Sequence, residues 1–502
     1  MPTSFKSTPI NWIVVIVIAS RLDSSQLYQV GMRILITFLL ATCSLVAFGN
    51  EIYTCKDTET GASVFTNIPA DIARKGLECQ VHATYDDNQP RSSRKERDDD
   101  VEEITNTKIT NTKRSHITPS LRLPNVVQAP VVVPAFINQT ENHFEFANSG
   151  VFTAFKNRWQ MKNESIRILH LGDSHVRNGF IGEAARRELQ SVRGNAGRGM
   201  VFPYALAKTY PQSDYQSTME GSWQSGNSIR PLRDIGLGVS GVVAQTSSTS
   251  SAFTLKFSQA QPAGETIVKV FFKSSMPNLR LTASTNKESV TWSTQDAGLF
   301  HSVATFKLHE QFSVLRIDID NAERRGQFEL HGVNIEKPSS GGVVFNSFGV
   351  DGATLGSLTT AAYLEAQLTE LKPDLVVLDF GSNELMNGSS ALSVKYQTTL
   401  IQIVRRLRAA RPQMVIVFAV PQGMRHRGRY IDVGAYAQFI KKLAIDNSCL
   451  FWNWYQVAGE DEAIQAWLSH GLANRDKVHL LAKGYKLKGE LLAKALLNTL
   501  RE

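Results

Sequence analysis

The sequence has few cysteines and none of the short motifs that hold metals or nucleotides. It contains four cysteines among 502 residues, and no two of them have the CxxC spacing of a zinc or redox site. No Walker loop, dinucleotide-binding glycine motif or metal-ligand cluster occurs, so we expect neither a cofactor nor a metal. With 42% apolar and 20% charged residues, a disordered, collagen-like or coiled-coil chain is excluded.

The chain also lacks a strong charge of either sign. Its 54 Lys and Arg residues exceed its 46 Asp and Glu residues by only eight. An excess of this size suits an anionic neighbourhood such as a cell wall, a membrane surface or a nucleic acid, and it selects none of them. At roughly 150 residues per domain, the length predicts about three domains.

Two apolar runs lie near the N-terminus. Residues 12–19 are too few to span a bilayer, which needs about 20 apolar residues. The second run follows Met32 and Arg33 and ends at the small-residue pattern of residues 47–49, which is typical of a secretory signal. We therefore expect residues 1–49 to be a signal region whose true start is Met32, with export to the periplasm. A retained membrane anchor facing the periplasm is the alternative.

Two segments separate the signal region from the rest of the chain. Residues 50–85 are rich in turn formers, and their run YTCKDTETGASVFTNIP resembles a small domain at the N-termini of many proteobacterial envelope proteins. Cys55 and Cys79 lie in this segment, where a disulfide would suit an exported protein. Residues 86–139 carry a dense run of charges followed by prolines, which predicts a solvated linker.

An α/β pattern occupies residues 140–221 and 341–502. Apolar runs alternate there with helical patterns, which indicates a parallel sheet covered on both faces. The expected strands are residues 166–171, 375–380, 414–420 and 450–452.

Residues 222–340 have a different pattern. Six short runs of alternating polarity are separated by turns, which is typical of an antiparallel sandwich. Because this block stands between two α/β stretches, we interpret it as an all-β domain inserted into a loop.

A possible nucleophile and its base stand far apart in the sequence. Ser174 belongs to a GDSH motif directly after the first expected strand of the α/β part, where open sheets assemble their sites. A serine needs a base to remove its proton, and a histidine needs a carboxylate to hold it; His479 and Asp476 form such a pair. Taken singly, the first motif can be a helix cap and the second a solvated loop pair.

Two further residues could stabilise an oxyanion. Asn383 follows an expected strand in the motif GSNE, and its amide can donate hydrogen bonds without titrating. Gly352 lies in FGVDGAT and can offer its backbone N–H. Each motif on its own could equally be an ordinary turn.

Together, these four motifs resemble the SGNH (GDSL-like) hydrolase superfamily over residues of about 140–220 and 341–502. The blocks of that superfamily supply Ser, Gly, Asn and His, which fall here on Ser174, Gly352, Asn383 and His479. The resemblance implies a catalytic triad of Ser174, Asp476 and His479. It also implies an oxyanion hole formed by Ser174, Gly352 and Asn383.

A narrower resemblance is to the peptidoglycan O-acetylesterases of Gram-negative envelopes. It is carried by GDSH, by GSNE with Glu384 in place of the usual Asp, by FGVDGA, and by the inserted β domain, which in those enzymes is similar to a carbohydrate-binding module. The resemblance implies an esterase that removes O-acetyl groups from an acetylated glycan polymer, most specifically peptidoglycan, and implies no nucleic-acid partner and no membrane contact beyond the export signal.

Three alternatives remain open at this point. One is an O-acetyltransferase and another is a different carboxylester hydrolase, because either could use the same triad. The third is a wall-binding protein without activity. The inserted domain, likewise, could dock a glycan or only brace the catalytic domain, and His175 could pack or touch substrate. The aromatic residues Trp452, Trp454 and Trp467 are expected in the core, with a sugar-stacking wall as the alternative.

Overall fold

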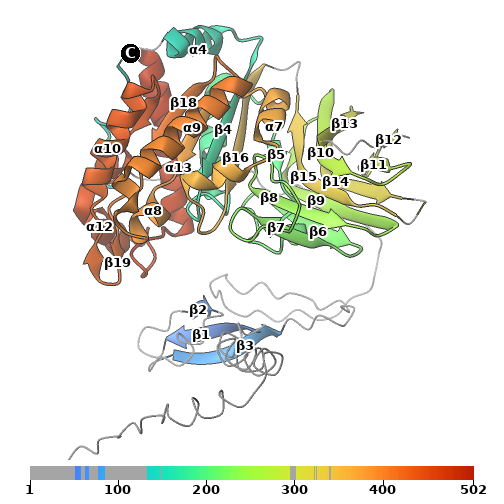
Figure 1. The fold of residues 1–502 in the computed structure, drawn as a ribbon, viewed down its shortest axis with the longest axis horizontal. Helices are drawn as coiled ribbons and strands as arrows, with labels where there is room; N and C mark the ends of the chain where they lie inside the picture. The colour runs from blue at the N-terminus through green and yellow to red at the C-terminus, as the bar shows by residue number, and fades with distance from the viewer. Residues whose placement is uncertain are drawn as a thin grey trace, which may run out of the picture. The chain divides into compact units, whose positions relative to one another are not determined.

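The computed structural model describes residues 51–57, 63–66, 77–84, 133–147, 150–293, 301–321, 323, 325–337 and 341–502 (Figure 1). The chain divides into two compact units, residues 1–123 and residues 124–502. The expected signal region, residues 1–49, lies outside the described residues, as does most of the expected linker. No helix in the described part of the chain is long and apolar enough to cross a membrane.

The first unit contains a three-stranded antiparallel sheet. Its strands β1 (Glu51–Asp57), β2 (Ser63–Thr66) and β3 (Leu77–Thr84) lie in the order β2-β1-β3. In the register of β1 and β3, Cys55 is opposite Cys79. Facing residues of antiparallel strands have Cα atoms roughly 4.5–5.5 Å apart, which a disulfide can bridge. The backbone is therefore compatible with the expected bridge.

The second unit is built on a five-stranded parallel sheet, which confirms the predicted α/β class. Its order is β16 (Gly342–Gly349), β4 (Ser165–Gly172), β17 (Leu375–Asp379), β18 (Val415–Ala419) and β21 (Leu450–Trp452). Every neighbouring pair is parallel. All five strands therefore end at the same edge of the sheet.

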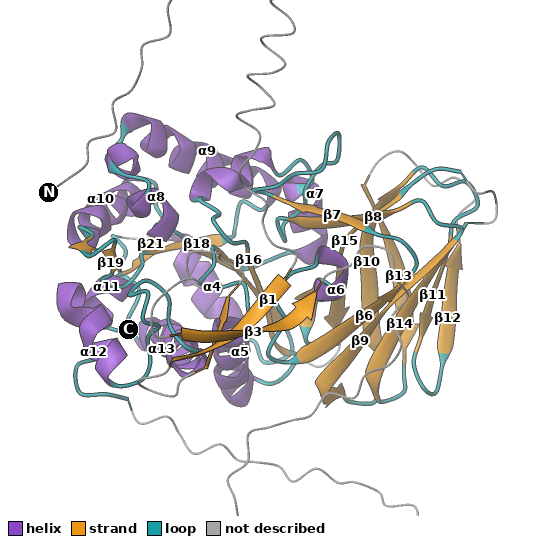
Figure 2. Cartoon of the chain, turned by 90° about the horizontal axis from the view of Figure 1, so that it is seen from below, coloured by secondary structure: helices purple, strands orange, loops and turns teal. Residues whose placement is uncertain are grey.

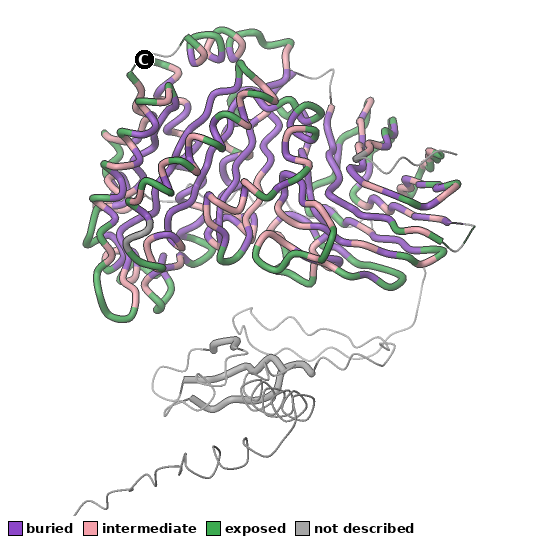
Figure 3. The backbone as a smooth tube through the Cα atoms, viewed as in Figure 1, coloured by how far each residue is buried: buried purple, intermediate pink, exposed green. Residues whose placement is uncertain are grey.

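Helices cover both faces of this sheet. Alternate residues of β4 enter different cores: Ile166 and Ile168 pack on one side, Leu169 and Leu171 on the other. Figure 2 shows α9 and α10 on one side of the strands and α5 and α13 on the other. One layer is α4 (Gly150–Gln160), α5 (Phe180–Arg193), α12 (Ala463–Ser469) and α13 (Ala482–Arg501); the other is α7 (Leu364–Leu371), α9 (Val394–Ala410) and α10 (Val433–Asp446). In Figure 3 the strands of the parallel sheet are mostly buried, and exposed residues lie on the outer helices and turns.

Two antiparallel sheets form the sandwich between β4 and β16. One has the order β13-β10-β15-β8-β7 with β5 paired to β15, and the other has the order β12-β11-β14-β9-β6. Their bounds are β5 (Gly199–Val201), β6 (Tyr215–Glu220), β7 (Gln224–Asn227), β8 (Val242–Thr246), β9 (Ser250–Gln261), β10 (Thr266–Ser274), β11 (Arg280–Ser284), β12 (Ser289–Ser293), β13 (His301–Leu308), β14 (Phe312–Asp320) and β15 (Phe328–Glu336).

The sandwich begins before residue 222, where the sequence pattern placed its start. Strand β6 pairs with β9, and β5 pairs with β15. Both strands were missed because they are short: β5 has three residues, and β6 carries polar residues over most of its six. Periodicity over so few residues cannot distinguish a strand from a loop.

The sandwich is joined to the α/β layers by a shared core. Met200 and Phe271 of the sandwich pack in the same buried cluster as Leu364 and Leu368 of α7. The backbone N–H of Val239 donates to the buried Gln367 at 2.7 Å. The inserted domain is therefore fused to its host rather than tethered by two linkers.

Several short elements complete the second unit. They are α6 (Tyr204–Ala207), η1 (Leu355–Thr360), α8 (Ser382–Met386), η2 (Ser389–Leu392), β19 (Arg425–His426), β20 (Arg429–Tyr430), α11 (Trp454–Val457) and η3 (Glu460–Glu462).

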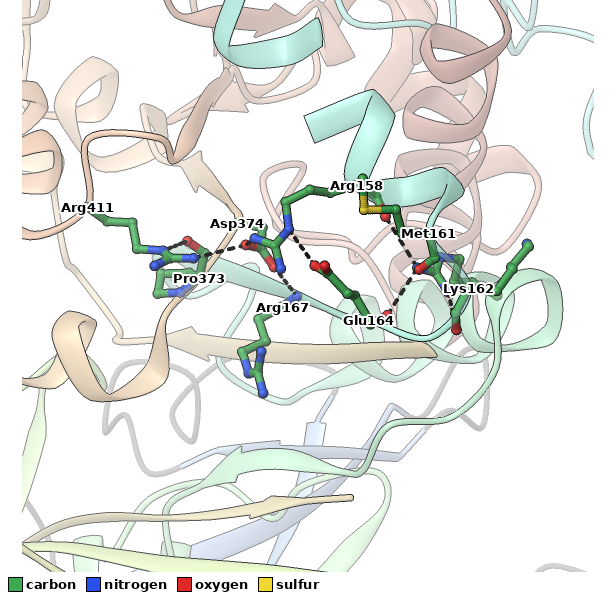
Figure 4. A network of polar contacts seen from close by, with 9 residues as sticks. Arg158, Met161, Lys162, Glu164, Arg167, Pro373, Asp374 and Arg411 are labelled. Carbon is green, nitrogen blue, oxygen red and sulfur yellow. Dashed lines mark hydrogen bonds and ion pairs between the residues drawn. The ribbon is translucent and has the colours of Figure 1, made fainter. Parts of the chain in front are cut away.

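The amino ends of the strands are held by one buried carboxylate. Asp374, just before β17, accepts a hydrogen bond from the backbone N–H of Arg167 in β4 at 2.9 Å. It also pairs with the guanidinium groups of Arg158 and Arg411 (Figure 4). Together these contacts fix the amino edge of the sheet, opposite the edge at which the strands end.

A second buried network lies near the carboxyl ends of the strands. The ammonium group of Lys488 in α13 is 2.9 Å and 2.8 Å from the two carboxylate oxygens of Asp379. Asp379 also contacts His170 Nε2 at 3.2 Å, and His170 Nδ1 contacts Ser347 Oγ at 3.2 Å. Burial alone would raise the pKa of Asp379, but Lys488 and His170 lower it, so the carboxyl remains charged.

We expect Lys488→Met to lower the free energy of unfolding by roughly 3–5 kcal/mol, because Asp379 would keep a buried charge without its main partner. Urea denaturation followed by circular dichroism measures the change. Lys483→Met, an exposed position of the same helix, is the matched control. Equal midpoints for the two variants would contradict a structural role for the ion pair.

Candidate active site

Ser174 stands in the turn between β4 and α5. The strand ends at Gly172, where a Cβ atom would lie 2.4 Å from Val176 Cγ2 and 2.7 Å from the carbonyl oxygen of Asp379. Only glycine leaves room for these contacts, which allows the chain to turn close to the neighbouring strand. The turn leaves Ser174 partly exposed, beyond the carboxyl edge of the sheet.

Ser174, His479 and Asp476 form one hydrogen-bonded row. Ser174 Oγ lies 2.8 Å from His479 Nε2, and His479 Nδ1 lies 2.7 Å from Asp476 Oδ2. The second oxygen, Asp476 Oδ1, accepts the backbone N–H groups of Val478 and His479, each at 2.9 Å. The structure thus places the three residues within the reach that a triad requires, although 305 positions separate the serine from the histidine.

The Asp476 carboxyl is held in its charged form. Its partial burial favours the neutral acid, but the hydrogen bonds from the His479 side chain and from the backbone outweigh this effect and lower its pKa. A carboxylate at this position favours a proton on His479 Nδ1. His479 Nε2 is then left as an acceptor, directed at Ser174 Oγ.

The loop that carries His479 is anchored by Gln422. The buried amide of Gln422 donates to the carbonyl oxygen of Val478 at 2.9 Å and accepts from Trp454 Nε1 at 3.2 Å. Trp452, Trp454 and Trp467 are fully buried, so the expected core position holds and they form no sugar-stacking wall. Of the three, Trp454 acts on the site indirectly, because it holds the Gln422 side chain that anchors the loop of the histidine.

Gly352 and Asn383 lie on two neighbouring loops beyond β16 and β17. Gly352 is exposed and has a φ of 75°, a conformation that favours glycine. Asn383 Nδ2 donates to the carbonyl oxygen of Ala353 at 2.8 Å. The contact places the amide beside the Gly352 loop and uses one of its two hydrogens, which leaves the second for another acceptor.

Glu384 joins these two loops, a function that the sequence analysis did not assign. Its Oε1 accepts the backbone N–H of Leu355 at 2.7 Å, and its Oε2 accepts that of Gly381 at 3.1 Å. Burial raises the pKa of Glu384 to about 7. Glu384 stands three residues after Gly381, which is the spacing of a capping box. The contact between these two residues could have been predicted from this spacing. Glu384 therefore keeps the loops of Gly352 and Asn383 in register.

His175 packs behind the triad. It is buried, its Nδ1 lies 3.1 Å from the hydroxyl of Tyr485, and its ring stacks on that of His479 with centroids 5.0 Å apart. Burial lowers the pKa of His175 well below its usual value, and the neighbouring His479 adds to this effect. His175 is thus a neutral packing residue that supports the imidazole of His479.

Asp173, directly before the nucleophile in the sequence, is also a buried acid. Its Oδ1 accepts the N–H of His175 at 2.9 Å, and burial raises its pKa to about 7. Within the described part of the chain, no group of His, Cys, Asp and Glu side chains is arranged to hold a metal ion. The hydrogen-bonded row of Ser174, His479 and Asp476 suits nucleophilic chemistry by Ser174.

Comparisons with known proteins show which family and which solved structures the chain resembles. Residues 335–487 match the model of the GDSL-like Lipase/Acylhydrolase family, a range that includes Gly352, Asn383, Asp476 and His479. The match begins near the end of β15, the last strand of the sandwich, and does not include Ser174. No curated protein sequence is significantly similar to the chain.

Among solved structures, a peptidoglycan O-acetylesterase is 25% identical, covers 73% of this chain and 98% of its own, and has a TM-score of 0.59. A family two carbohydrate esterase from Cellvibrio japonicus is 11% identical over 57% of this chain and 99% of its own, with a TM-score of 0.24. The chain is a carboxylic ester hydrolase that resembles the SGNH (GDSL-like) enzymes, and its structure is similar to that of a peptidoglycan O-acetylesterase.

Proposed function

We propose that this protein removes O-acetyl groups from a cell-wall glycan, specifically O-acetylated peptidoglycan, with Ser174 as the nucleophile. The observation that carries the proposal is the hydrogen-bonded row from Ser174 through His479 to Asp476. The substrate is supported by the structural similarity to a peptidoglycan O-acetylesterase over 73% of the chain.

In the proposed reaction His479 Nε2 takes the proton of Ser174 as Oγ attacks the acetyl carbonyl. Asp476 stabilises the imidazolium that forms. The sugar hydroxyl leaves with the proton of His479, and the acetyl group remains on Ser174. Water, deprotonated by the same histidine, then releases acetate and restores the serine.

The negative charge that develops on the carbonyl oxygen is stabilised by hydrogen-bond donors that are in position before the reaction begins. The proposed donors are the backbone N–H groups of Ser174 and Gly352 and the remaining amide hydrogen of Asn383. Glu384 holds two of the three on connected loops. Removing one such donor typically costs on the order of 10²–10³ in rate, because preorganised dipoles need no rearrangement as charge develops.

The proposed compartment is the periplasm, reached through the signal region of residues 1–49. The backbone register of Cys55 and Cys79 supports an oxidising compartment, since it suits a disulfide. We expect the exported protein to begin near Asn50 and to gain two hydrogens per molecule on reduction. Intact-mass measurement before and after reduction tests both expectations; a full-length, reduced protein would contradict them.

Acetate release tests the proposed substrate. The wild-type protein should release acetate from O-acetylated peptidoglycan and none from the same material after base treatment, and Ser174→Ala should release none from either. Release without an added acceptor sugar supports hydrolysis, whereas release that depends on an acceptor would show an O-acetyltransferase. Activity on 4-nitrophenyl acetate alone would mean that the enzyme acts on a different ester.

We expect Asp476→Asn to lower kcat/KM for 4-nitrophenyl acetate by on the order of 10²–10⁴, because an amide neither fixes the histidine tautomer nor stabilises the imidazolium. The control is Asp446→Asn, an exposed carboxylate on α10 that pairs with Lys442. A value for Asp476→Asn within threefold of the control would show that the carboxylate has no part in catalysis.

A further inference from the structure

A cavity of about 430 Å³ opens between the sandwich and the edge of the parallel sheet where the proposed nucleophile stands. Its wall includes Arg177, three residues after Ser174, and the three residues that precede Gly352. On the sandwich side, Ile229 lies 3.8 Å from the position of a Cβ atom on Gly352. The cavity therefore adjoins the proposed oxyanion loop without containing Ser174.

The lining of this cavity carries an excess of positive charge. Its charged residues are four cations and one acid: Arg177, Arg198, Lys208, Arg230 and Asp351. The first two cations are already paired, Arg177 with Asp351 and Arg198 with the buried Asp214 behind the wall.

Lys208 and Arg230 are exposed, and neither has an acidic partner within the described part of the chain. Two positive charges at the cavity are thus uncompensated. An acetyl ester is neutral, so the group to be hydrolysed gives no reason for these cations.

The remaining lining includes polar and aromatic residues besides aliphatic ones. The guanidinium carbon of Arg177 lies 3.5 Å from the centroid of the Tyr210 ring, and Tyr210 is half-exposed. Gln212 Nε2 donates to the carbonyl oxygen of Arg177 at 2.7 Å, which fixes this segment against the nucleophile turn. An exposed ring beside hydrogen-bonding groups is a surface on which a sugar can stack.

We propose that this cavity binds a carboxylate-bearing part of the acetylated glycan, so that the enzyme prefers an anionic sugar chain to a neutral one. The inference rests on the proposed function and specifies its substrate class. Peptidoglycan carries such carboxylates on the lactyl group of muramic acid and on its peptides. Lys208 and Arg230 supply the charge, and Tyr210 with Arg177 supplies the ring surface.

Two substrates that differ in one charge test the proposal. They are an O-acetylated disaccharide of N-acetylglucosamine and N-acetylmuramic acid with a free lactyl carboxylate, and the same compound with that carboxyl converted to its methylamide. Wild-type kcat/KM should be roughly tenfold higher for the anionic compound, mainly because its KM is lower. The factor is modest because ion pairs between a carboxylate and two exposed cations add little binding free energy. High salt should reduce this preference.

The variant Lys208→Gln/Arg230→Gln should abolish the preference and leave the rates on the methylamide and on 4-nitrophenyl acetate unchanged. The control Arg233→Gln/Lys256→Gln removes two exposed cations that do not line the cavity, and it should keep the wild-type preference. If the wild-type enzyme hydrolysed both disaccharides equally, the proposed anion site would be contradicted and the proposed function would stand. A wild-type enzyme active on 4-nitrophenyl acetate but on neither disaccharide would overturn the proposed function, and the anion site with it.

Discussion

A parallel sheet buried on both faces can place polar, reactive side chains only beyond the ends of its strands. Nearly every residue of β4 and β17 is buried among apolar neighbours, so neither strand can carry a solvent-exposed nucleophile on its faces. Because the five strands are parallel, the loops that follow them meet at one edge. Ser174, Gly352 and Asn383 come from three neighbouring strands, and this common edge brings them together although the sandwich separates the first from the others in sequence.

Several acids lie at the same edge in different surroundings. These surroundings set the pKa of each acid and thereby its function. Burial raises the pKa of Asp173 and of Glu384 to about 7, whereas Lys488 and His170 keep the similarly buried Asp379 charged. Asp476, closer to solvent, is charged through its hydrogen bonds to His479 and to the backbone. The carboxylate that can stabilise an imidazolium is thus the one that His479 and the backbone already keep ionised, while Asp173 and Glu384 serve as hydrogen-bond acceptors that position loops.

The order of the elements and the principal site residues could be predicted because each depends on local pattern or on a spaced motif. The strands of the parallel sheet are continuous apolar runs, and the motifs of Ser174 and His479 follow strand and loop signals that a sequence displays. The bridge from Glu384 to Leu355 could not be predicted, because it depends on how two loops 29 residues apart approach each other. The same holds for the Lys488–Asp379 pair, since a lysine on an amphipathic helix is normally expected at the surface.

The shared core of the sandwich and the α/β layers decides what the inserted domain can do. An insert joined by two flexible linkers could bind a glycan but could not hold it at a fixed distance from Ser174. Here Met200 and Phe271 share a buried cluster with α7, and Val239 is tied to Gln367, so the two parts that form the cavity walls are packed firmly together. Bracing and substrate binding are therefore compatible in one structure. Deleting the sandwich would expose the common core, and only substitutions on the cavity wall, such as those at Lys208 and Arg230, can separate the two functions.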